Sequence, residues 1–235
     1  MSDGSDDSGG DVVDGDPLAE RREFRDRLLE AALAHAAFDG WSRRTLLNAA
    51  VDAGIDAGTA RRLFPRGGDG LLAWLDDWAD RRMLAAVAGE ELDRLPVRRR
   101  IARLVRARLE PLEAHREAMR RAALANGVLP GNLAASGRAV WRTADRMWEA
   151  AGLAGPGAAA EGFSHYSRRA TLAAVLAATF LYWLEDRSDG SADTWAFLDR
   201  RIEGVMRIGK ARSRIEGWLG PFSGRPRAPA PGGPR

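Results

Sequence analysis

The stretch Ser42–Pro65, SRRTLLNAAVDAGIDAGTARRLFP, decides the fold. Ser42 is an N-cap residue for a helix that Gly54 ends, and Asp56 caps a shorter helix that stops at Phe64. A four-residue turn that carries glycine joins the two helices, and this is the spacing of a helix-turn-helix motif. The stretch therefore predicts a small helical unit near the start of an all-α protein.

Helical periodicity continues on both sides of this motif, and no alternation typical of strands interrupts it. Asp16 followed by Pro17 predicts a helix that begins there and runs to about Ala37. Further helices are expected at about 70–90, 96–125 with a break at Pro111, 132–151, 164–185 and 193–210. The apolar face of the 132–151 helix is expected to contain Val140, Trp141, Ala144, Met147 and Trp148.

The pattern divides the chain into five parts. They are an acidic tail over 1–16, a helix-turn-helix-like unit over 17–65, a helical domain over 66–210, an amphipathic helix over 208–222 and a flexible tail over 223–235. The 1–16 tail carries six aspartates and no base, so it reads as neither a transit peptide nor a signal peptide. The longest apolar run, 170–184, is shorter than the ~20 residues that span a bilayer. We expect a soluble or peripheral protein in the cytoplasm of a bacterium.

The composition excludes several classes of site. The 235 residues include no cysteine and three histidines that lie far apart in sequence. A disulfide framework and a thiolate metal site are therefore excluded, and no metal or cofactor is expected. No carboxylate sits in a helical pattern with histidine, and the glycine-rich pieces lack the lysine of a phosphate loop, so we expect a protein that is not an enzyme.

The charge of the helix-turn-helix unit argues against a nucleic-acid partner. Residues 18–64 contain eight arginines against seven acids, a net charge of +1, whereas affinity for DNA comes largely from neutralising phosphates. The second helix of the motif begins with Asp56, Ala57 and Gly58, which are poor groups for reading base edges. A structural three-helix unit is the preferred interpretation, and a DNA-binding regulator that responds to a ligand is the alternative.

Two other segments have charge patterns that suit an anionic surface. Residues 94–121 carry ten arginines against three glutamates, and either such a surface or a solvated, internally paired helix face explains them. In the 208–222 segment Ile215, Trp218, Leu219 and Phe222 share one apolar arc, with basic residues to one side. That arc is typical of a helix at a bilayer interface, and packing on the protein's own core or on a second subunit is the alternative.

The expected lipid site lies at the start of the most apolar helix. Arg169 shares a helix face with Leu172, Leu176 and Phe180. An arginine at the head of an apolar stripe is costly to bury without an anion. Two interpretations remain open: a salt bridge to an internal acid, or a phospholipid headgroup at the mouth of an apolar cavity.

The first 80 residues resemble the helix-turn-helix of TetR-type repressors, particularly over 28–36, 49–55 and 58–64. A longer set of motifs resembles the coenzyme Q (ubiquinone) biosynthesis accessory family, the ninth of the Coq set. The residues that carry this resemblance are Phe38-Asp-Gly-Trp41, Trp78-Ala-Asp-Arg-Arg-Met83, His115-Arg-Glu117, Tyr166 with Arg168-Arg-Ala-Thr-Leu172, Tyr182-Trp-Leu184, Thr194-Trp-Ala-Phe-Leu-Asp-Arg-Arg-Ile202 and Val205-Met206.

The resemblance implies a TetR-like helical bundle that has lost repression and binds lipid. It implies a homodimer that holds isoprenoid quinone precursors and phospholipid, contacts the membrane through a C-terminal amphipathic helix, and presents the precursor to the di-iron demethoxyubiquinone hydroxylase. It further implies that His165 and Tyr166 meet the hydroxylase and that Arg169 contacts a phospholipid headgroup. The expected location is the inner membrane of a bacterium, with eukaryotic relatives in mitochondria.

Overall fold

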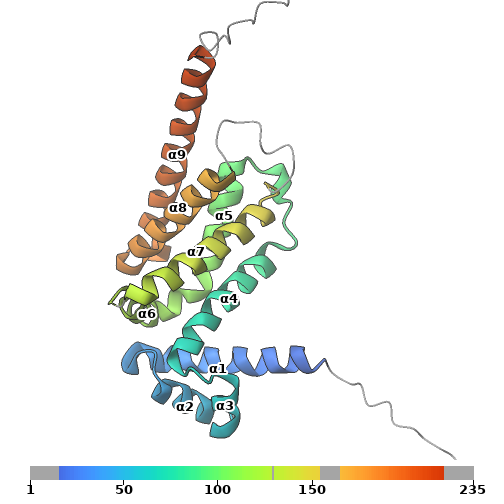
Figure 1. Ribbon diagram of the computed structural model, residues 1–235, viewed down its shortest axis with the longest axis vertical. Coiled ribbons are helices and arrows are strands. Elements are labelled where there is room, and N and C mark those ends of the chain that lie inside the picture. The colour runs from blue at the N-terminus through green and yellow to red at the C-terminus, as the bar shows by residue number, and fades with distance from the viewer. Residues whose placement is uncertain (1–15, 129, 154–164, 220–235) are drawn as a thin grey trace, which may run out of the picture. The chain divides into compact units, whose positions relative to one another are not determined.

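The computed structural model describes residues 16–128, 130–153 and 165–219. Every regular element in these ranges is a helix, which confirms the all-α prediction (Figure 1). The chain forms two compact units, divided after Trp78. The helix α4 (Gly68–Val87) runs through the division.

The first unit contains the predicted three helices, α1 (Pro17–Asp39), α2 (Arg43–Asp52) and α3 (Ala57–Leu63). Each expected N-cap is present: the side chains of Asp16, Ser42 and Asp56 accept hydrogen bonds from the backbone N–H groups of Leu18, Thr45 and Thr59, at 2.9–3.1 Å. Gly54 follows α2 with a φ of +66°, a left-handed conformation that favours glycine. The local sequence signals therefore act as predicted.

Arginines from α1 hold the first unit together. Arg25 donates hydrogen bonds to the Leu63 carbonyl oxygen, and its guanidinium lies 4.4 Å from the centre of the Trp74 ring. Arg27 donates to the Ala53 carbonyl oxygen at 2.6 Å. Some N–H donors of these two arginines are therefore used within the unit, although both guanidinium groups keep their positive charge.

The second unit contains α5 (Val97–Leu109), α6 (Arg116–Val128), α7 (Pro130–Ala150), α8 (His165–Glu185) and α9 (Ala192–Leu219), with short 3₁₀ turns at 92–94, 110–115 and 189–191. The predicted break at Pro111 is confirmed, because that residue lies in the 3₁₀ turn between α5 and α6. Helix α8 packs between α7 and α9, and α5 packs against α9. Side chains that are fully enclosed in this core include Leu104, Leu109, Met147, Trp183 and Leu198.

The 208–222 segment, predicted as an amphipathic helix of its own, is helical up to Leu219 and continues α9, which begins at Ala192. Its amphipathic, membrane-facing character stays a prediction. The helix runs past the expected boundary near 210 although glycines stand at 204, 209 and 217. A glycine inside a helix costs only about 1 kcal/mol, which a long helix can absorb.

A buried carboxylate joins three helices of the second unit. Asp80 on α4 accepts hydrogen bonds from Arg108 Nε on α5 at 2.8 Å and from Thr143 Oγ1 on α7 at 2.9 Å. Arg146 Nη1 on α7 lies 3.0 Å from the other carboxylate oxygen. Asp80 and Arg108 are both buried. Removal of the carboxylate would leave a buried guanidinium without its counter-ion.

We predict that Asp80→Asn lowers the free energy of unfolding by about 3–5 kcal/mol, the usual cost of breaking a buried ion pair. Urea unfolding followed by circular dichroism measures the change. Glu91→Gln is the matched control, because it removes the carboxylate of an exposed pair, Arg94–Glu91 at 2.6 Å, and is expected to cost less than about 1 kcal/mol. Equal losses in the two variants would contradict the importance of burial.

Candidate functional site

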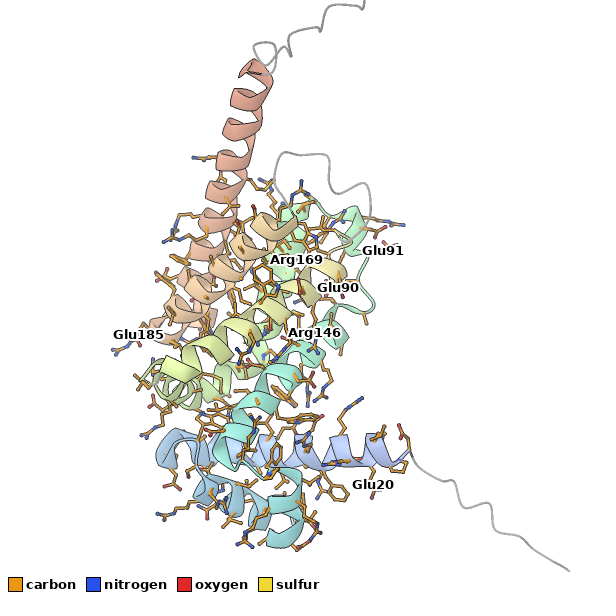
Figure 2. The ribbon with its side chains drawn as sticks, in the orientation of Figure 1. Glu20, Glu90, Glu91, Arg146, Arg169 and Glu185 are labelled. Atoms are coloured by element: carbon orange, nitrogen blue, oxygen red, sulfur yellow. The ribbon has the colours of Figure 1, made fainter. Side chains whose placement is uncertain are left out.

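The candidate site centres on Arg169, near the start of α8. Figure 2 labels Arg169. Its Nε atom lies 2.7 Å from Oδ1 of Asp145 on α7, and 15% of the arginine side chain is exposed. Both atoms are shielded from solvent, and their alignment is that of a charge pair rather than of a directed hydrogen bond. Of the two interpretations left open by the sequence, the structure contains the internal salt bridge. The burial of Arg169 therefore requires no external anion.

The apolar stripe beyond Arg169 is part of the helical core. Leu172 and Leu176 are buried, and Phe180 is half-buried with its ring stacked 6.0 Å from that of Trp183. The structure thus brings the predicted stripe to the inner side of α8, next to the Arg169–Asp145 pair. Core packing and lipid contact both use this arrangement of side chains, so the role of the stripe in lipid binding stays a prediction.

The other predicted site residues lie where the side chains are not described. His165 and Tyr166 open α8, and Ile215, Trp218 and Leu219 are in the last turns of α9, where the structure describes the helix but not the side chains. Phe222 lies outside the described residues. The partner-binding and membrane-binding assignments therefore stay predictions.

The basic segment 94–121 is largely paired within the protein. Arg100 donates to the Ala151 carbonyl oxygen at 2.8 Å. Seven other arginines of the segment face carboxylates: Arg94–Glu91, Arg103–Glu90, Arg106–Asp199, Arg108–Asp80, Arg116–Glu113, Arg120–Glu117 and Arg121–Glu117. Only Arg98 and Arg99, both exposed, have no such contact among the described residues. The structure favours the paired helix face over one continuous anion-binding surface.

A polar junction between α8 and α9 was not predicted from the sequence. Arg116 of α6 contacts Glu113, donates to the carbonyl oxygen of Asp186 and places its guanidinium 4.7 Å from the centre of the Trp183 ring. Glu113 also accepts from the indole N–H of Trp183 at 2.8 Å and from Ser191 at 3.0 Å. The available signal was that Arg116 and Trp183 both belong to motifs that carry the family resemblance.

The Asp186 side chain anchors the start of α9. It accepts hydrogen bonds from the backbone N–H groups of Ser188 at 2.8 Å and Thr194 at 2.9 Å, and from both hydroxyl groups. Burial raises the pKa of Asp186, but the hydrogen bonds from Ser188 and Thr194 outweigh that effect, so the net pKa is well below its ordinary value of 3.8. The ionised form is the one that the junction stabilises.

Within the described ranges, no group of histidine, aspartate or glutamate side chains is arranged to hold a metal ion. Within the same ranges, none of the helices combines the length and the apolar character needed to cross a bilayer.

Comparison with known proteins finds a family that this chain resembles. The family model described as COQ9 matches residues 133–209, which cover most of α7, all of α8 and the first part of α9. The chain is 26% identical over 201 residues to the human "Ubiquinone biosynthesis protein COQ9, mitochondrial", a match that covers 83% of this chain. Over most of its length, therefore, the chain is similar to COQ9 proteins. The corresponding COQ9 protein of Drosophila melanogaster is 26% identical over 204 residues, or 85% of this chain.

The COQ9 relatives are longer than the part that this chain matches. The match spans 61% of the human protein and 60% of the Drosophila protein. Among solved structures, a TetR transcriptional regulator from Nitrosomonas europaea ATCC 19718 has a TM-score of 0.63 at 24% identity and covers 77% of this chain and 97% of its own. One from Rhodococcus sp. RHA1 has a TM-score of 0.55 at 18% identity, with 79% and 96% covered. These likenesses confirm the predicted TetR-like fold of this chain.

We predict that Asp186→Asn lowers the free energy of unfolding at about pH 7, and that the gap from the wild type narrows as the pH falls below about 4. A carboxylate with a lowered folded-state pKa stabilises the fold above its ordinary pKa, and this contribution is lost as the pH falls toward the folded-state value. Urea unfolding across this pH range measures the gap. Asp189→Asn, at an exposed position in the same junction, is the control and is expected to change little. A gap that stays constant with pH would contradict the role of the ionised group.

Proposed function

We propose that this protein is a non-enzymatic accessory protein of ubiquinone biosynthesis that binds isoprenoid quinone precursors and phospholipid. The observation that carries the proposal is the similarity of 83% of the chain to the human ubiquinone biosynthesis protein COQ9. The COQ9 model matches over 133–209, the segment that contains the Arg169–Asp145 pair and the stripe of Leu172 and Leu176. In this proposal the protein acts at a membrane surface, the inner membrane of a bacterium, and delivers the precursor to the demethoxyubiquinone hydroxylase.

The proposed mechanism is extraction of the precursor from the bilayer. An isoprenoid tail that moves from the hydrocarbon of a bilayer into an apolar protein interior loses little hydrophobic free energy, because both environments exclude water. The protein then has to supply access and orientation rather than a large binding energy. The helices after residue 70 would surround the tail, His165 and Tyr166 would meet the hydroxylase, and the C-terminal part of α9 would contact the bilayer.

The role proposed for Arg169 is an exchange of anions. A guanidinium binds a carboxylate and a phosphate with the same forked geometry, so a phospholipid headgroup can replace Asp145 as the counter-ion of Arg169. Because the ion pair lies at the head of the apolar stripe, the acyl chains of such a lipid would follow Leu172 and Leu176. Asp145 would hold the arginine in place while no lipid is bound.

The proposal includes a homodimer, and an exposed apolar face of α8 and α9 supports it. Leu181 is 59% exposed and Tyr182 is 38% exposed, and the Tyr182 ring stacks 4.5 Å from that of Phe197 on α9. Exposed large apolar side chains that lie close together are typical of surfaces that a second protein chain covers. A second copy of this chain would bury these side chains.

Native mass spectrometry of the protein purified without added lipid tests the proposed function. The expected spectrum contains adducts with the masses of isoprenoid quinone precursors and phospholipid on a dimeric protein. The alternative function is a TetR-type, ligand-responsive DNA-binding regulator, which the helix-turn-helix unit favours. A spectrum of lipid-free protein, together with tight and salt-dependent binding to a DNA duplex, would replace the lipid-binding proposal with that alternative.

We predict that Asp145→Asn increases the amount of anionic phospholipid retained and that Arg169→Gln decreases it. Each change is expected to be about tenfold, which corresponds to the usual free energy of a hydrogen bond to a charged group. Asp145→Asn removes the internal competitor for the guanidinium, and Arg169→Gln removes the guanidinium itself. Lipid extraction of the purified variants, quantified per protein, measures retention. Glu149→Gln is the control, because it removes an exposed acid from the same helix. If both variants only lower stability and retain wild-type amounts of lipid, the Arg169–Asp145 pair is structural.

A further inference from the structure

An open groove on the surface of α7 is not explained by the core or by the Arg169–Asp145 pair. The groove has a volume of about 490 Å³ and is lined by Gly137, Arg138, Trp141 and Arg142. These residues share one side of the helix, since they are spaced by one and four positions. The sequence predicts Trp141 for the apolar face of this helix, together with Ala144 and Met147. In the structure Trp141 is half-buried in the groove, and Ala144 and Met147 are buried in the core.

The arginines of the groove differ from most others in the second unit. Arg138 and Arg142 are exposed, and neither makes an ion pair or a hydrogen bond with any residue that the structure describes. By contrast, eight of the ten arginines over 94–121 are engaged with carboxylates or carbonyl oxygens. Two unengaged guanidinium groups therefore lie one turn apart on the same helix, on either side of one tryptophan.

The indole of Trp141 is also without a partner in the described part of the chain. Other tryptophans donate their indole N–H within the protein: Trp74 to Asp26, Trp78 to Glu30, Trp183 to Glu113 and Trp195 to the Gly190 carbonyl oxygen. An indole with a free N–H on an apolar, solvent-facing groove suits an environment that is apolar on one side and polar on the other. The interface of a lipid bilayer is such an environment.

The charge around the groove favours a negatively charged occupant. The nearest acid along this side of α7 is Asp145, one turn after Trp141, and it is engaged by Arg169. Arg138, Arg142 and Arg169 contribute +3 and Asp145 contributes −1, a local net charge of +2. Arginine matches the phosphate group in a forked, two-bond geometry, and indole rings bury against the glycerol and upper acyl region.

We propose that the groove of Arg138, Trp141 and Arg142 binds the phosphate-bearing headgroup of an anionic phospholipid in a bilayer surface. The site is separate from the lipid interior invoked above, and it deepens the proposed function by giving the second unit a membrane contact outside α9. In this arrangement α7 rests on the bilayer with the two guanidinium groups on phosphates and the indole beside them. The adjacent Arg169–Asp145 pair then lies within one helical turn of the headgroup layer.

Vesicle co-sedimentation of the full chain tests this site. We compare vesicles of phosphatidylcholine alone with vesicles of phosphatidylcholine and phosphatidylglycerol. The wild type is expected to bind the anionic vesicles, and Arg138→Glu/Arg142→Glu is expected to lower that binding by at least about tenfold, since each basic residue near an anionic surface contributes about a factor of five or more. Trp141→Ala is expected to weaken it as well, and Trp141→Phe to preserve most of it.

The matched control is Arg98→Glu/Arg99→Glu. It makes the same change in net charge at two other exposed arginines that lack partners among the described residues, and it is expected to keep binding within about twofold of the wild type. Circular dichroism and the urea midpoint establish that each variant is folded. Equal losses in the groove and control variants, or no loss in the groove variant, would overturn the proposal.

Two further measurements distinguish this membrane contact from a small-anion site and from the cargo site. Inorganic phosphate at matched ionic strength is expected to leave vesicle binding unchanged. Displacement of the protein from vesicles by phosphate, beyond the effect of salt, would indicate a small-anion site and overturn the membrane assignment.

Lipid adducts in native mass spectra are expected to persist in Arg138→Glu/Arg142→Glu. Loss of those adducts in the groove variant would show that the groove belongs to the cargo site and not to a separate membrane contact. A wild type without adducts that still binds anionic vesicles through the groove would contradict the proposed function but not this site.

Discussion

The structure of the second unit depends on how buried guanidinium groups are neutralised. The bundle is rich in arginine, and a buried cation without a counter-ion costs far more than any single apolar contact contributes. Asp80 provides the counter-ion for Arg108 and contacts Thr143 and Arg146, so one carboxylate fixes the positions of α4, α5 and α7. In the same way, Asp145 on α7 provides the counter-ion for Arg169 on α8. Positions of helices and pairing of charges are therefore determined together.

Much of the fold follows from local signals in the sequence. The caps at Asp16, Ser42 and Asp56, the left-handed Gly54 and the break at Pro111 depend on a few neighbouring residues, and each is found as predicted. Local signals could not predict the partner of Arg169, because Asp145 is on another helix. The requirement for an anionic partner would have been met equally well by many other acids in the chain. The depth to which each residue of the apolar face of α7 is buried was beyond reasoning from local signals for a related cause. A helical face of mixed size leaves several positions eligible for the core, and only the packing of α7 against its neighbours selects Ala144 and Met147.

The motifs that carried the family resemblance have structural roles in this chain. Arg116, Trp183 and Thr194 come from three separate motifs, and all three meet at the junction of α8 and α9 around Glu113 and Asp186. A junction that holds two helices together accounts for the structural use of these motifs. It does not by itself identify a ligand, since function depends on the chemistry of a site and the same fold serves many. Support for lipid binding must therefore come from α7 and the start of α8.

Two arginine settings on α7 and α8 differ in a way that bears on function. Arg169 already has a carboxylate, so a lipid phosphate must compete with Asp145 and gains only the difference between the two anions. Arg138 and Arg142 have no acid to displace among the described residues, so a phosphate that reaches them gains the full interaction, reduced only by solvent screening. A phosphate would thus bind first at Arg138 and Arg142, and this contact would bring a second lipid headgroup within reach of Arg169. On the proposed mechanism, contact with the bilayer would therefore precede release of Arg169 from Asp145.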